Sequence, residues 1–254
     1  MTSTAEFLRA PGLPAPHGFF TRRGGVSSGP YASLNCSLSG ADALANVLRN
    51  RALAAEAVGA DPARLVGLMQ VHGAAVVRVD HPWRPGEGPS ADAMVTDRPD
   101  IALGVISADC APVLFSSPAG DIVGAAHAGW RGALGGVLEA TVAALRNLGA
   151  PQIRAVIGPC IGPGSYEVAA DLRDAVLAHD LSDARFFGPG KRPDRWQFDL
   201  PGYCAARLTA AGAAVHATYI DTLSDPDRFF SHRRRTLAGG GPIGHQISII
   251  RPQD

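Results

Sequence analysis

Three side chains of types that can bind a metal or act as nucleophile and base follow apolar segments of this 254-residue chain. Cys110 and His127 follow the apolar segments 101–106 and 122–126, which we predict to be buried strands. His72, beside a glycine, follows a third apolar segment and is a further candidate. Because strand ends deliver side chains from a rigid scaffold into a common site, we predict that Cys110 and His127 face each other across a pocket.

The residue types of this group favour a metal site. Imidazole nitrogen and thiolate sulfur are ligands that zinc prefers, and three protein ligands with one open position are typical of catalytic zinc. Such a site lowers the pKa of a bound water to about 7. The wide spacing is not diagnostic, so the residues alone leave open a hydrolase with Cys110 as nucleophile and His127 as base.

The overall composition argues against several classes of protein. Lys plus Arg number 23 and Asp plus Glu number 23, so no net field would attract nucleic acid or an anionic membrane. No apolar stretch has the length of a membrane span, and the N-terminus lacks the pattern of a secretory signal. The four cysteines form no CxxC pair, which favours a reducing, cytoplasmic location. We expect Cys36, Cys160 and Cys204 to be core residues.

The pattern of apolar residues predicts a mixed α/β protein. The 30 glycines and 20 prolines gather at the ends of apolar runs, which indicates short elements joined by tight turns. Strands and helices alternate without an internal repeat or linker, so we predict one domain over 1–254. Strands are expected at 18–22, 65–70, 75–79, 92–97, 101–106, 122–126, 153–157, 215–220 and 247–250. Helices are expected at 42–58, 134–148, 168–178 and 200–211, with an irregular excursion over 182–198.

Several sequence blocks resemble those of the laccase-domain family. The signature blocks are QVHG at 70–73, ADC at 108–110 and HAGWRG at 127–132. The likeness extends over nearly the whole chain, through TRRGGVSSGPYASLN at 21–35, IGPCIGPGSYEV at 157–168 and FFSHRR at 229–234. Members of this family were first labelled polyphenol oxidases. They are now regarded as zinc-dependent purine nucleoside phosphorylases, and some are described as peptidoglycan editing factors.

The resemblance implies a fold, a metal and an activity. It implies a layered domain with central β-sheets covered by helices, in which His72, Cys110 and His127 bind one zinc. It also implies phosphorolysis of adenosine, inosine, guanosine and S-methyl-5′-thioadenosine by phosphate, with adenosine deamination as a companion activity. The expected partners are thus purine nucleosides and phosphate, with no nucleic acid or membrane, and the chain is expected to act as a monomer or homodimer.

Four further residues are candidates for contact with substrate. Arg22 and Asn35 lie in the matching blocks and are candidates for substrate or phosphate contacts, as is Arg131 at the start of a helix, where exposed amides favour an anion. Asp109 is a candidate catalytic proton carrier, because both reactions move a proton on or off a purine nitrogen. The three arginines at 233–235 are either a solvated face or a phosphate clamp.

One position departs from the family pattern. Family members typically carry a TGR-like turn before the last strand, whereas this chain has His245 where an arginine is expected. If that position touches phosphate, we expect weaker or pH-sensitive binding; a peripheral position would have no effect.

Three other functions remain as alternatives. A copper polyphenol oxidase is disfavoured because multicopper oxidases use HxH pairs, and the eight histidines of this chain form none. Mixed thiolate and imidazole ligands nevertheless bind copper. A peptidoglycan-precursor editing factor would use the same pocket. A non-catalytic binding module is disfavoured by a ligand set with an open coordination position.

Overall fold

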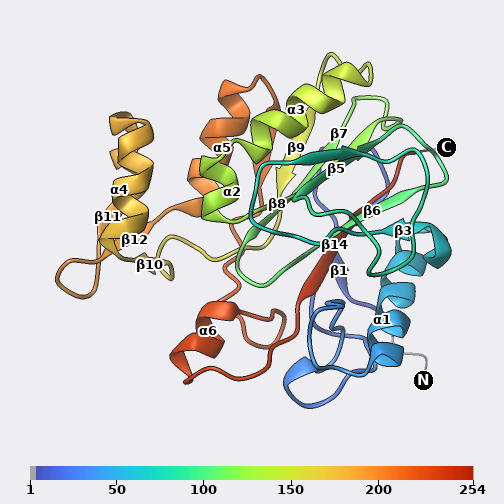
Figure 1. Cartoon of the computed structure of the whole chain (residues 1–254), viewed down its shortest axis with the longest axis horizontal. Helices are drawn as coiled ribbons and strands as arrows, with labels where there is room; N and C mark the ends of the chain where they lie inside the picture. Colours follow the sequence, from blue (N-terminus) through green and yellow to red (C-terminus); the bar gives the residue numbers. More distant parts are fainter. Residues whose placement is uncertain (1–3, 254) are drawn as a thin grey trace.

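The structure of the protein is a computed structural model that describes residues 4–253. Two large β-sheets form its centre (Figure 1). The five strands of the first sheet are, in spatial order, β1 (Phe7–Leu8), β2 (His17–Phe20), β14 (Gln246–Ile250), β6 (Ala102–Ser107) and β3 (Leu65–Val66). The six strands of the second are β13 (Ala214–Ala217), β9 (Arg154–Ile157), β7 (Ala111–Ser116), β8 (Val123–Ala128), β5 (Ala93–Thr96) and β4 (Val76–Arg78).

The two sheets pack face to face and helices cover their outer faces. Leu103 of β6, Leu114 of β7 and Ala125 of β8 belong to one buried cluster between the sheets. Helices α3 (Val137–Asn147) and α5 (Leu200–Ala210) cover the six-stranded sheet, and α1 (Leu44–Ala57) covers the five-stranded sheet. Central strands with both faces covered must be apolar throughout, which explains the continuous apolar runs of β6, β7 and β8. The predicted layered α/β fold is confirmed.

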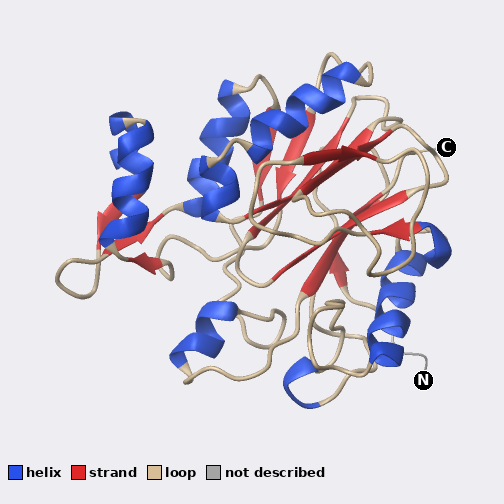
Figure 2. Cartoon of the chain, in the orientation of Figure 1, coloured by secondary structure: helices blue, strands red, loops and turns tan. Residues whose placement is uncertain are grey.

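A third, small sheet projects from this body together with α4 (Ala170–His179), at the left of Figure 2. Its strands are β10 (Glu167–Val168), β12 (Trp196–Phe198) and β11 (Phe187–Pro189), and a 3₁₀ segment (Leu181–Phe186) precedes β11. The prediction of an irregular excursion over 182–198 is therefore wrong. Strands of two or three residues are too short to show the alternation of apolar and polar residues that marks a strand in a sequence. The stacking of Phe187 on Phe198, which stabilises these strands, is a tertiary contact that the sequence does not reveal.

The elements next to the candidate site also differ from the prediction. Strand β7 was not predicted; it forms an antiparallel hairpin with β8, and Pro112 lies opposite His127, which is inside β8 and not after it. The helix predicted over 134–148 is α3, which begins at Val137, and a separate short helix that was not predicted, α2 (Trp130–Leu134), precedes it; Gly136 between the two takes a left-handed φ of 91°.

The remaining regular elements are short. Helix α6 (His232–Leu237) contains the three consecutive arginines, and 3₁₀ turns occur at Gly29–Tyr31 and Pro62–Arg64. No helix within residues 4–253 is long and apolar enough to cross a membrane. The domain boundaries 1–254 stay a prediction.

Candidate metal centre

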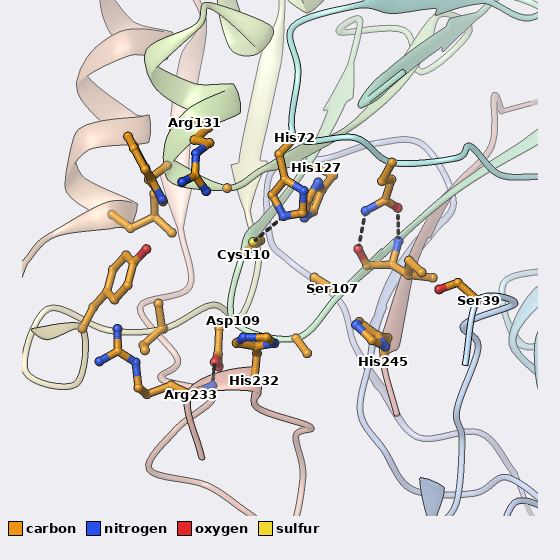
Figure 3. Close-up of a pocket in the computed structure, with 18 residues that line it drawn as sticks. Ser39, His72, Ser107, Asp109, Cys110, His127, Arg131, His232, Arg233 and His245 are labelled. Atoms are coloured by element: carbon orange, nitrogen blue, oxygen red, sulfur yellow. Dashed lines mark hydrogen bonds between the residues drawn. The ribbon is translucent and has the colours of Figure 1, made fainter. Parts of the chain in front are cut away.

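A cavity of about 400 Å³ opens where β6 ends, β7 begins and α2 begins (Figure 3). His72, Cys110 and His127 lie together on its wall. The three candidate ligand atoms, one from each side chain, lie within 4.8 Å of one another. Sγ of Cys110 is 3.9 Å from Nε2 of His72, and the two imidazole rings meet edge to face with centroids 4.8 Å apart. The structure thus brings the three candidate ligands together.

The backbone around these residues is built for close approach. His72 and Asp109, which precedes Cys110, both take left-handed φ angles, of 59° and 89°. Such angles are uncommon for residues other than glycine and cluster at functional sites. Gly129 carries no side chain where one would collide with the ligands, since a Cβ there would lie 2.9 Å from Cδ2 of His72 and 3.0 Å from Sγ of Cys110.

A buried carboxylate, Asp92, holds two of the three ligands in place. Nδ1 of His127 donates to Oδ1 of Asp92 at 2.9 Å, which leaves Nε2 of His127 free for a metal. The backbone amides of Val71, His72 and Gly73 donate to the same carboxylate at 3.1, 3.0 and 2.7 Å. Sequence reasoning missed Asp92, because its complete burial beside His127 depends on the pairing of β5 with β8.

The charges of these groups favour metal ligation. Burial raises the pKa of Cys110, but the imidazoles of His127 and His72 outweigh it and lower the pKa to about 6. Burial lowers the pKa of His127, whereas the Cys110 thiolate and Asp92 raise it to about 9. Without a metal, Cys110 and His127 therefore form a thiolate–imidazolium pair at neutral pH. A thiolate is the form of cysteine that binds metals.

This pairing predicts a single reactive thiol. In the metal-free protein, we expect iodoacetamide to alkylate Cys110 alone, because the thiolate is the nucleophile. The rate of alkylation should reach half of its maximum near pH 6 and increase further at higher pH. Cys36, Cys160 and Cys204 are buried, and burial raises the pKa of each thiol. Peptide mass spectrometry after timed alkylation measures this. Alkylation spread over several cysteines, or no protection of Cys110 by added zinc, would contradict it.

The donor set fits a metal ion. One thiolate and two imidazoles match the preference of zinc, and a metal ion held by these three side chains alone would keep one coordination position for water or substrate. The same donors also bind copper. The group could therefore hold a metal ion.

Two arginines of the cavity wall lie on aromatic rings. The guanidinium of Arg131 is 4.5 Å from the ring centre of Trp130, and that of Arg233 is 5.5 Å from the ring centre of Tyr166. All four residues line the cavity, and Figure 3 shows both arginines on the side away from His245. The wall therefore combines positive charge with aromatic surface, which suits an anion together with a flat ring.

Only one arginine of the 233–235 run lines this cavity. The guanidinium of Arg234 donates to the carbonyls of Phe229 and Thr222, so it holds the chain around α6. Arg235 contacts His232 and the carbonyl of Gly241. The run is thus neither a wholly solvated face nor a clamp of three arginines.

Asp109 lines the cavity, but its carboxylate is fully engaged. Oδ1 accepts from the hydroxyl of Thr222 at 2.6 Å, and Oδ2 accepts from the hydroxyl of Ser231 at 2.9 Å and the amide of Arg233 at 2.6 Å. These contacts fix the start of α6, and with it Arg233 and His232, against the strand that follows Cys110. They favour a positioning role for Asp109 over proton transfer.

Arg22 and Asn35 are not on the cavity wall. Nε of Arg22 donates to the carbonyl of Ala32 at 2.7 Å, and its guanidinium lies 4.5 Å from the ring centre of Phe230. The amide of Asn35 is buried, donating to Asp42 at 2.9 Å and accepting from the backbone amide of His245 at 2.9 Å. Both side chains hold loops together, and neither is placed to touch a molecule in this cavity directly.

His245, which stands where the family pattern has an arginine, does line the cavity. Burial first, and then the charges of His127, His232 and Arg235, lower its pKa to about 4. His245 is therefore neutral at pH 7 and does not supply the charge of an arginine.

Other cavity residues gave no clear sequence signal. Trp130, Tyr166 and His232 reach the wall from α2, from the turn before β10 and from α6. Each of the three lies in a block that resembles the family, Trp130 in HAGWRG, Tyr166 in IGPCIGPGSYEV and His232 in FFSHRR, but the sequence alone gave none of them a role at the site.

Comparisons with known proteins find relatives over most of the chain. The model of the family described as multi-copper polyphenol oxidoreductase laccase matches residues 16–253. A Streptomyces coelicolor protein named purine nucleoside phosphorylase is 45% identical over 231 residues, covering 89% of this chain and 94% of that protein. A Pseudomonas aeruginosa protein with the same name is 40% identical over 222 residues, covering 86% and 88%. The crystal structure of a Neisseria meningitidis protein superposes with a TM-score of 0.85 at 34% identity, covering 99% of this chain and 100% of that chain.

Proposed function

The chain belongs to the multi-copper polyphenol oxidoreductase laccase family, and from this premise we propose that it is a zinc-dependent purine nucleoside phosphorylase. Its substrates would be phosphate and adenosine, inosine, guanosine or S-methyl-5′-thioadenosine, with adenosine deamination as a side activity. The names of the Streptomyces coelicolor and Pseudomonas aeruginosa relatives support the phosphorylase. The observation that carries the proposal is the ligand group of His72, Cys110 and His127 in a cavity with an aromatic, cationic wall.

In phosphorolysis, a phosphate oxygen forms a bond to the anomeric carbon of the ribose while the bond from that carbon to the purine nitrogen breaks. The nitrogen gains, overall, the proton that the hydrogen phosphate loses, and the products are the free base and a ribose 1-phosphate. The cavity, about 400 Å³, is within the usual range for a small-molecule site, roughly 300–1,000 Å³.

The chain's own residues would bind and orient the reactants. The rings of Trp130 and Tyr166 offer apolar surface to the purine, and Arg131 and Arg233 give the wall a positive potential that attracts an anion. Asp109 keeps Arg233 in place through its backbone amide. A bound zinc ion would supply Lewis-acid chemistry at the wall formed by its three ligands.

A cysteine hydrolase is the second candidate, because the structure adds a third member to the Cys–His pair. Asp92 accepts from His127, and Cys110 carries a lowered pKa, which is the arrangement of nucleophile, base and orienting acid. That reading leaves His72, 3.9 Å from the sulfur, without a role, whereas metal ligation uses all three side chains.

The two remaining alternatives draw less support. Within residues 4–253 one group of His, Cys and carboxylate ligands is close enough to share a metal, whereas a multicopper oxidase needs several sites. Editing of a peptidoglycan precursor would use the same cavity and is tested with the same variants on a different substrate.

Incubation with adenosine, with and without phosphate, tests the proposal. The zinc-loaded protein is expected to release adenine and ribose 1-phosphate only when phosphate is present, and to form inosine in either condition. Chromatography separates the three products. Adenine release that does not depend on phosphate would favour hydrolysis and contradict the phosphorylase.

A further inference from the structure

A second cavity, of about 270 Å³, adjoins the first. Ser39, Gln70 and Ile106 line both cavities. The side chain of Gln70 is fixed between them, because its amide donates to the carbonyl of Ile106 at 2.8 Å and its oxygen accepts from the amide of Ile106 at 2.9 Å. A ligand in the second cavity would therefore lie beside a ligand in the first.

The second cavity contains a buried and uncompensated positive charge. Arg51 of α1 lines it and is only 5% exposed. Nη1 of Arg51 donates to the carbonyl of Cys36 at 3.4 Å, and Nη2 has no hydrogen-bond partner among residues 4–253. Burial raises the pKa of the Cys36 thiol to about 12, so that thiol is neutral and does not balance the charge. A buried guanidinium is costly unless it is paired, and arginine keeps its proton in proteins.

The rest of the wall leaves room for a ligand at this charge. None of the described residues that line the second cavity is acidic, and four of them are glycines. A Cβ at Gly67 would lie 3.2 Å from Nη2 of Arg51, so the missing side chain leaves space beside that buried nitrogen. The volume exceeds that of a phosphate ion and leaves space for several waters, each of which occupies about 30 Å³ in the liquid.

We propose that this second cavity binds phosphate and that Arg51 is the residue that neutralises it. The inference rests on the proposed function, in which phosphate is a substrate that must lie next to the nucleoside. A guanidinium presents paired N–H donors that match two oxygens of a phosphate. Arg131 is by contrast exposed and stacked on a ring, so water already solvates its charge. Within the described part of the chain, the charge of Arg51 is neither solvated nor paired, and a bound anion would balance it.

Thermal unfolding of the zinc-loaded full chain, freed of excess metal, tests this without any nucleoside. Phosphate is expected to raise the melting temperature above that in chloride of equal ionic strength, because a ligand that binds only the folded state stabilises it. Arg51→Met should lose this increment, and without phosphate it should be at least as stable as the parent, because an unpaired buried charge is gone. Arg49→Met is the matched control: Arg49 lies on the same helix, is half exposed and pairs with Glu56. It should keep the increment.

A second variant keeps the charge and blocks access to it. Gly67→Ala places a methyl group against Nη2 of Arg51, and we expect it to weaken phosphate binding about tenfold, equivalent to 1.4 kcal/mol. In turnover, the KM for phosphate should rise by the same factor while the KM for the nucleoside stays unchanged. Retention of the phosphate increment by Arg51→Met, or its absence from the parent protein, would overturn the assignment. Failure to release a purine base would overturn the proposed function and leave the binding result standing.

Discussion

Replacing Cys110 with alanine is expected to remove zinc from the purified protein and to lower inosine phosphorolysis by more than about a hundredfold, since loss of an outer partner of a metal ligand already costs about 10–100-fold. Cys110 is one of three candidate ligands, and its lowered pKa keeps it in the thiolate form that binds metals. Two imidazoles alone would leave an incomplete site. Elemental analysis and the rate of hypoxanthine release measure the two effects.

Cys204→Ala is the control for this variant. Cys204 is a buried thiol of α5 whose pKa is raised by burial, so its loss should change neither zinc content nor activity. If Cys110→Ala kept its zinc and lost all activity, Cys110 would be a nucleophile and the hydrolase would replace the phosphorylase.

Replacing Asp92 with asparagine is expected to weaken zinc binding about 10–100-fold, because the carboxylate orients His127 and fixes the turn that carries His72. Each oxygen of Asp92 accepts from two donors, so an amide NH₂ in place of either oxygen faces donors it cannot satisfy. Leaving a buried donor unpaired costs about 1–3 kcal/mol, so the free energy of unfolding should also fall. Competition with a chelator and urea unfolding measure these effects.

Asp97→Asn provides the comparison at the other end of β5. Asp97 is 37% exposed and pairs with Arg78 at 3.6 Å, and an exposed ion pair contributes little to stability. This variant should behave like the parent protein. Equal zinc affinity in Asp92→Asn and Asp97→Asn would show that the Asp92 contact does not support the metal site.

The sequence predicted a mixed α/β protein because the buried strands are continuous apolar runs, whereas the layered arrangement was implied by the family resemblance. It did not predict β7, although 111–116 is such a run, nor the small sheet of β10, β11 and β12, which has strands too short for a period. The break between α2 and α3 depends on the left-handed φ of Gly136, a conformation that glycine permits without requiring it.

The candidate ligands could be predicted because cysteine and histidine carry recognisable chemistry and their blocks resemble a known family. Asp92 and Arg51 could not, since each matters only through what folding places beside it: an imidazole for Asp92 and an empty volume for Arg51. Arg22 and Asn35 have the right chemistry for substrate contacts, yet their partners are backbone groups and Asp42. The cytoplasmic location and the monomeric or dimeric state stay predictions.

Titration of zinc into the metal-free protein, followed by the release of hypoxanthine from inosine, tests the central claim most directly. We predict that the rate rises until about one zinc is bound per chain, as three protein ligands at one site imply, and that it requires phosphate throughout. Full activity in the metal-free protein, or a zinc-dependent rate that is the same without phosphate, would contradict a zinc-dependent phosphorylase.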